Sequence, residues 1–294
     1  IRYLQHVRHT LPLLPRDRKA GTKMTFELPE TGKKTRAKNL LLGLNLSNNG
    51  SACVLEDGKP VWYLEAERAS YVKYDYDIRI LLDRLPKGIE HIALADSFWQ
   101  RGNKQVDNVK MLSAVKKKFP GATLYDYRKK HHMTHAACGF YNSGFTSATC
   151  IVVDSNGSKT PDGLEIESVF FAPTWDTIHK TMFSPDNIGF GRRFEEACVH
   201  YGWHYMDAGK VMGKSAYDSE PAKSLQAEWE ERVLDLICTA PTKDIVLAGG
   251  CFLNCVANYK ALRRFPDYRF YAEPLANDGG TAMGAAYLAY HGID

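Results

Sequence analysis

The chain has 294 residues, 44% of them hydrophobic, which is enough to bury a sizeable core in one large domain or two packed lobes. No stretch reaches the roughly 20 uninterrupted apolar residues of a membrane span, and the first residues form no signal-peptide core, so we expect a soluble, cytoplasmic protein with no membrane partner. The seven cysteines include no CxxC pair, which argues against a disulfide framework or a zinc knuckle.

Charge is distributed unevenly along the chain. The first 40 residues contain ten Lys or Arg and three acids, a net charge of +7 in a chain whose total is +4. We interpret residues 1–38 as a basic amino-terminal arm. Such an arm either remains solvated or attracts a phosphate-rich partner such as nucleic acid, and both alternatives stay open.

From residue 39 onward, the pattern predicts a β-meander followed by alternating helices and strands. Two strands flank a polar turn at 47–51, and a third strand follows at 61–65. The next expected elements are a helix at 78–85, a strand at 89–95, a helix at 106–119, a strand at 122–125 and a helix at 131–141.

A second unit repeats this order from residue 149. A strand at 149–154 meets a polar turn containing Gly157, and another strand follows at 165–172. The remaining expected elements are helices at 194–201 and 223–239, a strand at 244–248, a helix at 252–264, a strand at 268–271 and a helix at 280–289. The repetition predicts a duplicated α/β fold with lobes at 39–147 and 148–294 and a ligand cleft between them.

The sharpest local signal is the pair His131 and His135. Residues at i and i+4 share one helix face, where two imidazoles can bind one metal ion, whereas His132 points elsewhere. A distant carboxylate would complete a two-histidine, one-carboxylate set suited to iron or zinc. The spacing cannot identify that ligand, and the pair also occurs as ordinary surface polarity.

Gly249 and Gly250 end a buried strand just before a predicted helix. Glycines there let the backbone approach a nucleotide, with the N–H groups of the helix facing its anionic parts. Asn254 and Asn258, spaced i and i+4, could hydrogen-bond ribose or base from one face of that helix. The alternative is a tight strand-to-helix turn without a ligand.

Two further glycine-containing segments carry charged side chains. Lys210 lies between Gly209 and Gly213 in a segment too irregular for a plain helix, and its spacing differs from a P-loop. Asp278 precedes a Gly-rich helix start, where a carboxylate either caps the helix or binds a cation.

Together and in this order, these motifs resemble the O-carbamoyltransferase family of nodulation-factor and antibiotic biosynthesis. The resemblance rests on HHMTHAACGFY at 131–141, GKVMGKSAY at 209–217, AGGCFLNCVAN at 248–258 and DGGTAMGAA at 278–286. More loosely, the order resembles the catalytic subunit that makes threonylcarbamoyl-adenosine in tRNA. The resemblance implies the actin-like ATPase fold, a duplicated RNase H-like fold, with ATP in the interlobe cleft.

The resemblance also implies roles for individual residues. It implies a divalent metal held by His131, His135 and Asp278, with iron favoured over magnesium or zinc. The implied nucleotide-binding positions are Asn45, Asn48, Ser51, Asp154, Gly157, Gly209, Gly213, Gly249, Gly250, Asn254 and Asn258. Lys73 becomes a candidate to face the carbamoyl group, with a surface ion-pair cluster as its alternative. Lys210 could polarise the carbamoyl oxygen, and His132 is the candidate base.

The sequence departs from the family pattern in two phosphate loops. Amides stand at Asn48 and Asn49 where the family usually carries histidine, and Ser155 stands where it usually has glycine. Longer members add a carboxy-terminal domain that activates carbamoyl phosphate, which we expect this chain to lack. Activation would then occur in this domain, in a partner domain or homodimer, or in residues outside the given sequence.

The expected activity is carbamoyl transfer from carbamoyl phosphate, through a carbamoyl adenylate made with ATP, to an acceptor hydroxyl. Aromatic residues beside Lys73, at Tyr71, Tyr74 and Tyr76, make a hydroxymethylated nucleotide or nucleic acid one acceptor to consider. The alternatives are a tRNA threonylcarbamoyl transferase-like enzyme and a non-catalytic regulatory subunit that binds ATP and metal.

Overall fold

The computed structural model describes residues 40–97, 104–161, 163–184, 189–217 and 219–294. The basic arm predicted at 1–38 lies outside the described residues. In the described part of the chain, no helix is long and apolar enough to cross a bilayer.

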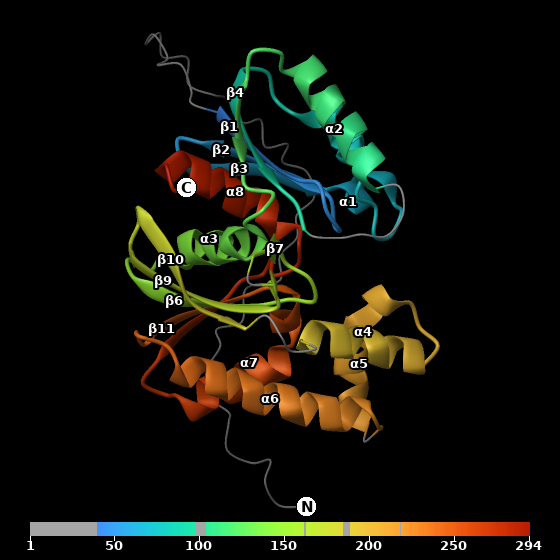
Figure 1. Cartoon of the computed structure of the whole chain (residues 1–294), viewed down its shortest axis with the longest axis vertical. Coiled ribbons are helices and arrows are strands. Elements are labelled where there is room, and N and C mark those ends of the chain that lie inside the picture. Colours follow the sequence, from blue (N-terminus) through green and yellow to red (C-terminus); the bar gives the residue numbers. More distant parts are fainter. Residues whose placement is uncertain (1–39, 98–103, 162, 185–188, 218) are drawn as a thin grey trace, which may run out of the picture. The chain divides into compact units, whose positions relative to one another are not determined.

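Two five-stranded sheets of identical topology form the framework (Figure 1). The first has the order β3-β2-β1-β4-β5 and consists of β1 (Leu40–Asn45), β2 (Ser51–Glu56), β3 (Lys59–Glu65), β4 (Ile89–Ala95) and β5 (Thr123–Asp126). The second has the order β10-β9-β6-β11-β12 and consists of β6 (Ala148–Val153), β9 (Glu167–Thr174), β10 (Thr177–Ser184), β11 (Asp244–Ala248) and β12 (Arg269–Ala272). In each sheet three antiparallel strands are followed by two that join in parallel, so the predicted duplication is confirmed.

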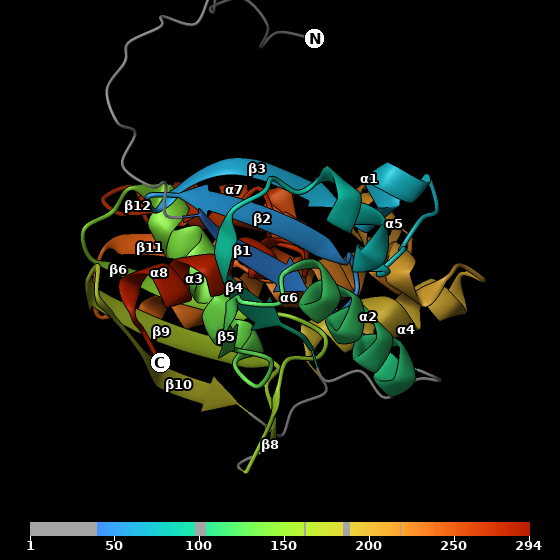
Figure 2. The same cartoon turned by 90° about the horizontal axis from the view of Figure 1, so that it is seen from above.

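Two helices fill the space between the sheets, α3 (His131–Ser143) and α8 (Gly280–His291). Helix α3 follows the first sheet in sequence but packs on β6, β9 and β11 of the second, whereas α8 packs on β1, β2 and β4 of the first. Figure 1 shows the first sheet above α8, and Figure 2 shows α3 and α8 next to each other. Each half of the chain thus supplies the inner helix of the other, and the boundary at 147/148 separates the sheets but not the helices.

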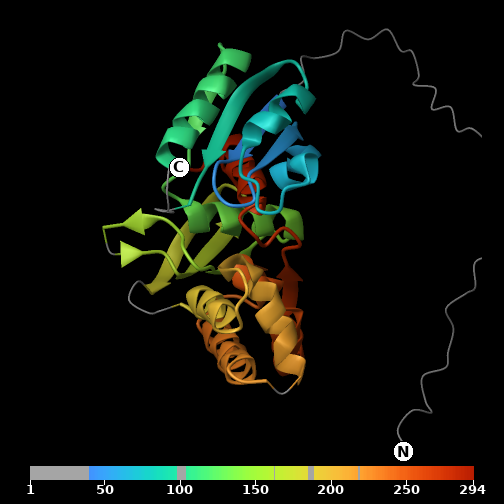
Figure 3. The ribbon, with the colours of Figure 1, turned by 90° about the vertical axis from the view of Figure 1, so that its right-hand side faces the viewer.

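The remaining helices cover the outer faces of the sheets (Figure 3). On the first sheet, η1 (Ile78–Arg84) and α2 (Lys104–Lys118) bury alternate strand residues such as Leu42 and Leu44. On the second sheet the cover is formed by α4 (Phe190–His200), α6 (Ala222–Cys238) and α7 (Cys255–Arg264). The short elements are α1 (Ala66–Ser70), β7 (Lys159–Thr160), β8 (Gly163–Leu164), η2 (Tyr205–Asp207), α5 (Ala208–Lys214), η3 (Ser215–Tyr217) and η4 (Gly250–Leu253).

Strand β10 lies in a segment for which no element was expected, and two further segments fold differently from the prediction. The segment around Lys210, expected to be irregular, forms α5 because Val211 is fully buried in the core of the second lobe. The helix expected at 252–264 starts only at Cys255, because the Asn254 side chain accepts a hydrogen bond from the Ala257 N–H (3.1 Å) and caps it.

Gly284 lies where α8 crosses α3, and a Cβ there would lie 1.8 Å from the Thr134 carbonyl oxygen. We expect Gly284→Ala to lower the free energy of unfolding by about 1–3 kcal/mol, because overpacking outweighs the better helix propensity of alanine. Urea denaturation measures this change. Gly121→Ala is the control, since a Cβ added at that glycine would meet nothing within 4 Å; an equal effect of both substitutions would contradict the packing argument.

Candidate active site

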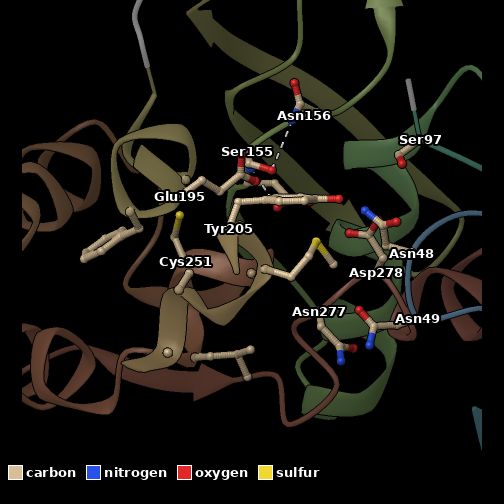
Figure 4. Close-up of a pocket in the computed structure, with 18 of the residues that line it drawn as sticks. Asn48, Asn49, Ser97, Ser155, Asn156, Glu195, Tyr205, Cys251, Asn277 and Asp278 are labelled. Atoms are coloured by element: carbon tan, nitrogen blue, oxygen red, sulfur yellow. Dashed lines mark hydrogen bonds between the residues drawn. The ribbon is translucent and has the colours of Figure 1, made fainter. Parts of the chain in front are cut away.

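A cavity of about 270 Å³ lies between the two lobes. One part of its wall is polar and includes Asn48, Asn49, Asp154, Ser155 and Asp278. Another part is apolar and comes from the second lobe, through Phe194, Met206, Ala208, Met212, Cys251 and Leu253. Figure 4 shows Asn48 and Asp278 on the side of the pocket opposite Cys251. A wall of this kind suits a ligand with an aromatic group at one end and an anionic group at the other.

Two histidines and two carboxylates meet at the polar end of the pocket. The Nε2 atoms of His131 and His135 are 3.1 Å apart. Asp154 Oδ2 lies 3.2 Å and 3.4 Å from them, and Asp278 Oδ1 lies 3.5 Å and 3.8 Å from them. One ligand atom from each side chain lies within 4.8 Å of the others, a spacing that fits a single metal ion.

The electrostatics of this cluster favour positive charge at its centre. Burial lowers the pKa of His131, yet Asp278 and Asp154 outweigh burial and raise that pKa to about 10. Burial raises the pKa of Asp278, but His131 and His135 hold it well below its usual range. The carboxylates therefore remain ionised and stabilise a cation between them, whether a proton on histidine or a metal ion.

Side chains outside the cluster fix its geometry. The His131 Nδ1 atom lies 3.1 Å from the Asp96 carbonyl oxygen, a contact that directs Nε2 toward the carboxylates when Nδ1 carries the proton. The Ser47 Oγ lies 3.0 Å from Asp278 Oδ2 and 2.7 Å from Asn45 Oδ1, and its one proton can be donated to either oxygen. Asn45 is fully buried and also donates to the Asn48 carbonyl (2.9 Å). Asn45 thus shapes the first polar loop from beneath rather than lining the pocket.

The second lobe caps the helix that carries the histidines. Lys130, which precedes α3, makes no side-chain cap. Instead, the His131 N–H donates to Ser158 Oγ (2.9 Å), and the His132 N–H donates to Glu165 Oε2 (3.3 Å). Glu165 also accepts from the Ser158 N–H (3.0 Å). The first N–H groups of a helix have no hydrogen-bond acceptor within the helix, and these contacts supply acceptors for two of them. The same contacts connect α3 to the loop that follows Asp154.

Lys73 and Lys210, the two predicted catalytic lysines, meet at one carboxylate. Asp207 accepts from Lys73 Nζ (2.6 Å) and the Tyr74 hydroxyl (2.5 Å) of the first lobe, and from Lys210 Nζ (2.8 Å) of the second. The hydrogen bond to Asp207 raises the pKa of Lys73. The Lys73 ammonium is therefore a cation at neutral pH rather than a base, and Asp207 links the two lobes beside the pocket.

The structure brings only some of the predicted nucleotide-binding residues to the pocket. Those that line it are Asn48, Asp154, Gly209 and Gly250. Those outside its lining are Asn45, Ser51, Gly157, Gly213, Gly249, Asn254 and Asn258.

Most of the second group have structural contacts of their own. The Ser51 hydroxyl donates to the Gly279 carbonyl (2.7 Å), and Asn258 Nδ2 donates to the Phe252 carbonyl (2.7 Å). Gly249 has a φ of 89°, and a Cβ there would lie 2.4 Å from the Val153 carbonyl, so the turn requires glycine.

His132, the predicted base, is fully buried and does not line the pocket. Its Nδ1 atom lies 2.8 Å from the Ser168 hydroxyl, and its Nε2 has no partner among the described residues. Burial lowers the pKa of His132 to about 3. A Cβ on Gly157 would lie 2.7 Å from the His132 ring, so this ring packs beneath the second loop instead of facing a ligand.

Sequence reasoning missed two contributions to the site. The sequence assigns Asp154 to nucleotide binding, but the structure also places it in the histidine cluster. The sequence feature that could have indicated this is its position directly after the first strand of the second lobe. Asp207 was not predicted as a site residue. In the sequence it is an ordinary acid three residues before Lys210, and nothing there indicates its contact with Lys73 of the other lobe.

Comparison with known proteins places part of the chain in a family model. Residues 203–287 match the model described as Carbamoyltransferase N-terminus. The chain is 22% identical over 318 residues to an uncharacterized protein of Synechocystis sp., covering 81% of this chain and 49% of that protein. It is 24% identical over 213 residues to the nodulation protein NolNO of Sinorhizobium fredii, covering 54% of this chain and 30% of that protein. The chain thus spans half or less of the length of these relatives.

Solved structures show the same fold at low sequence identity. The activator of 2-hydroxyisocaproyl-CoA dehydratase from Clostridium difficile with bound ADPNP has a TM-score of 0.52 and 10% identity, covering 86% of this chain and 95% of that chain. Full-length HypF in its phosphate- and nucleotide-bound form has a TM-score of 0.50 and 12% identity. The match covers 88% of this chain and 56% of the HypF chain. The expected actin-like ATPase fold is confirmed.

We expect Asp207→Ala to loosen the contact between the lobes, because three donors lose their common acceptor. Hydrogen exchange should become several-fold faster at 71–77 and 204–210. Asp207 makes no side-chain cap for α5, so the substitution removes no helix cap. Asp83→Ala, which breaks a surface pair with Lys118 (3.1 Å), is the control; unchanged exchange at 71–77 in Asp207→Ala would refute the link.

Proposed function

We propose that this chain is the nucleotide-binding catalytic part of an O-carbamoyltransferase, which moves a carbamoyl group from carbamoyl phosphate to an acceptor hydroxyl. The observation that carries the proposal is the cluster of His131, His135, Asp154 and Asp278 at one end of an interlobe pocket. Segment 203–287, which matches the carbamoyltransferase model, supplies Asp278 and much of the apolar wall.

ATP fits the pocket with its base on the apolar wall and its phosphates at the polar end. The amides of Asn48 and Asn49 can donate to phosphate oxygens, as can backbone N–H groups near Ser155. Gly191 supports this placement, since a Cβ there would lie 2.5 Å from the Ser155 backbone nitrogen. The first turn of α4, which has no side-chain cap, therefore lies close to the loop at Ser155. Helix amino termini that bind phosphate approach a loop in the same way.

The donor set fits a divalent metal, for which we propose iron. Two neutral imidazole nitrogens and two carboxylate oxygens suit iron or zinc better than magnesium, which prefers oxygen ligands and water. His131, His135, Asp154 and Asp278 would hold it. When bound, such a metal neutralises charge on nucleotide phosphate oxygens.

The chemistry proceeds in two stages. Carbamoyl phosphate and water give carbamate and phosphate, and carbamate attacks the α-phosphate of ATP to give carbamoyl adenylate and pyrophosphate. The acceptor hydroxyl then attacks the carbamoyl carbon, AMP leaves, and the hydroxyl proton passes to solvent. Lys73 and Lys210, both paired with Asp207, would stabilise negative charge on the carbamoyl oxygen. His132 has no part in this proposal because its ring does not reach the pocket.

A second candidate is a regulatory subunit that binds ATP and metal without turnover. The observation that favours it is the first polar loop, where Asn48 and Asn49 line the pocket with amides that cannot transfer protons. The two candidates differ in turnover alone.

The metal assignment predicts that Asp154 matters as much as the histidines. We expect Asp154→Ala and His135→Ala each to weaken metal binding by more than the roughly 10- to 100-fold typical of residues that only orient ligands. Metal content after dialysis and competition with a chelator measure this. His200→Ala, on an exposed histidine of α4, should retain the metal. Full metal binding by Asp154→Ala would reduce the site to the three residues expected from the sequence.

The transferase assignment predicts that label from carbamoyl phosphate appears on an acceptor. Purified protein would be incubated with ATP, labelled carbamoyl phosphate and sugars, hydroxymethylated nucleotides, DNA or tRNA. We expect AMP, pyrophosphate and a carbamoylated hydroxyl in equal amounts, and their loss in Asp154→Ala. Tight ATP binding without any of these products would favour the regulatory subunit; label on a tRNA adenosine would favour a threonylcarbamoyl transferase-like enzyme.

A further inference from the structure

Aromatic and cationic side chains of both lobes gather at the edge of the pocket. We call this set the aromatic rim; its members are Lys73, Tyr74, Trp203, His204, Tyr205 and Lys210. Tyr74 and Tyr205 line the pocket, and Figure 4 shows Tyr205 extending into it. The rim is therefore continuous with the proposed ATP site and offers a place for the second substrate.

Aromatic contacts join the two lobes across the rim. The Tyr74 ring stacks on His204 with 5.3 Å between centroids and 15° between planes. His204 in turn lies 4.5 Å from the Tyr205 ring at 33°. The three rings form a connected series, stacked at one step and tilted at the next, and its two end members, Tyr74 and Tyr205, line the pocket. Flat aromatic surfaces of this kind bind nucleobases by stacking, irrespective of base identity.

The rim also carries positive charge. Lys73 Nζ lies 4.4 Å above the Tyr74 ring, and Lys210 Nζ lies 5.8 Å from the Trp203 ring. Asp207 balances one of these two ammonium groups. Glu67, which accepts from the Tyr74 N–H (3.0 Å), is paired with Arg68 (3.4 Å) and adds no net charge. Cations interleaved with rings suit a ligand that bears both bases and phosphates.

The backbone at Tyr74 supports a role for its side chain. Its φ is 64°, in the left-handed region that favours glycine or asparagine, and Tyr71 has a φ of 59°. Bulky residues in this region cost free energy and are concentrated at ligand-binding sites. A turn alone would be served better by glycine, so the ring at position 74 accounts for the tyrosine.

Resting on the proposed function, we propose that the aromatic rim binds a nucleotide-bearing acceptor and presents its hydroxyl to the carbamoyl group. The same chemistry is shared by a free mononucleotide and a single-stranded polynucleotide. A neutral sugar fits less well, because Asp207, the carboxylate at the rim, already accepts from three donors. In the transfer step a bond forms between the acceptor oxygen and the carbamoyl carbon, the bond between that carbon and the phosphate oxygen of AMP breaks, and the hydroxyl proton leaves to solvent.

The test measures binding by the full chain to a labelled single strand of about 12 nucleotides, to the same strand with abasic sites, and to deoxycytidine monophosphate. Neither carbamoyl phosphate nor turnover is needed. Tyr74→Ala should weaken binding of the strand with bases by about 5- to 100-fold, the range for one lost stacking contact. Tyr74→Phe, which keeps the ring and loses only the contact with Asp207, should bind nearly as wild type.

The charges are tested separately. Lys73→Met should lower the slope of log affinity against log salt by about 0.7, the value for one phosphate contact to a single strand. Controls are Tyr259→Ala, a tyrosine of α7 that is 60% exposed and outside the lining of the pocket, and Lys87→Met on an exposed loop. The basic arm is present in every variant, so its contribution cancels.

The outcomes distinguish a polynucleotide from a free nucleotide, and failure of the rim proposal from failure of the transferase proposal. A higher affinity for the strand than for the mononucleotide identifies a polynucleotide acceptor. Similar affinities of the two, calculated per binding site, identify a free nucleotide. Both results support the proposal. Equal binding of abasic and intact strands, equal loss in Tyr74→Phe and Tyr74→Ala, or loss of ATP affinity alone in Tyr74→Ala would overturn it. Carbamoyl transfer to a non-nucleotide acceptor that survives Tyr74→Ala would also overturn the rim while leaving the transferase intact.

Discussion

The convergence of two carboxylates on two buried histidines is the interaction on which the rest of the site depends. His131 and His135 are buried, so their polar atoms require partners inside the protein. Asp154 and Asp278 provide them, and both carboxylates also line the pocket. The same groups that satisfy the histidines therefore face the pocket, so a cation held at their centre would lie next to any ligand bound there.

The exchange of inner helices explains how residues so distant in sequence meet. Helix α3 is packed on the second sheet, which brings its first turn to the end of β6, where Asp154 follows. Helix α8 is packed on the first sheet and against α3, which brings Asp278, just before its start, to the same point. Gly284 permits this packing because α8 touches the α3 backbone there. The cluster is thus a consequence of the duplicated topology and not of one loop.

The sequence predicted the parts of this structure that depend on local order. Strand and turn patterns identified both halves, and the i, i+4 spacing placed His131 and His135 on one face. Contacts between distant segments were less accessible: Asp154 joins the cluster through tertiary packing, and Asp207 is matched with Lys73 from the other lobe. The contacts of Asn254 could not be predicted either: its side chain caps a helix and donates to Gln226 (2.6 Å).

The histidine cluster and the Asp207 group are two of the polar connections between the lobes, and they differ in burial. The histidine cluster lies inside, where few alternatives to its partners exist and breaking it leaves charge uncompensated. At the other connection the Lys73 side chain is 63% exposed whereas the Asp207 side chain is 9% exposed, so water reaches the lysine end of the contact. Of the two connections, the one at Asp207 is therefore the more accessible to solvent. A ligand that enters past Asp207 would meet the positively charged lysines first and the buried carboxylates last.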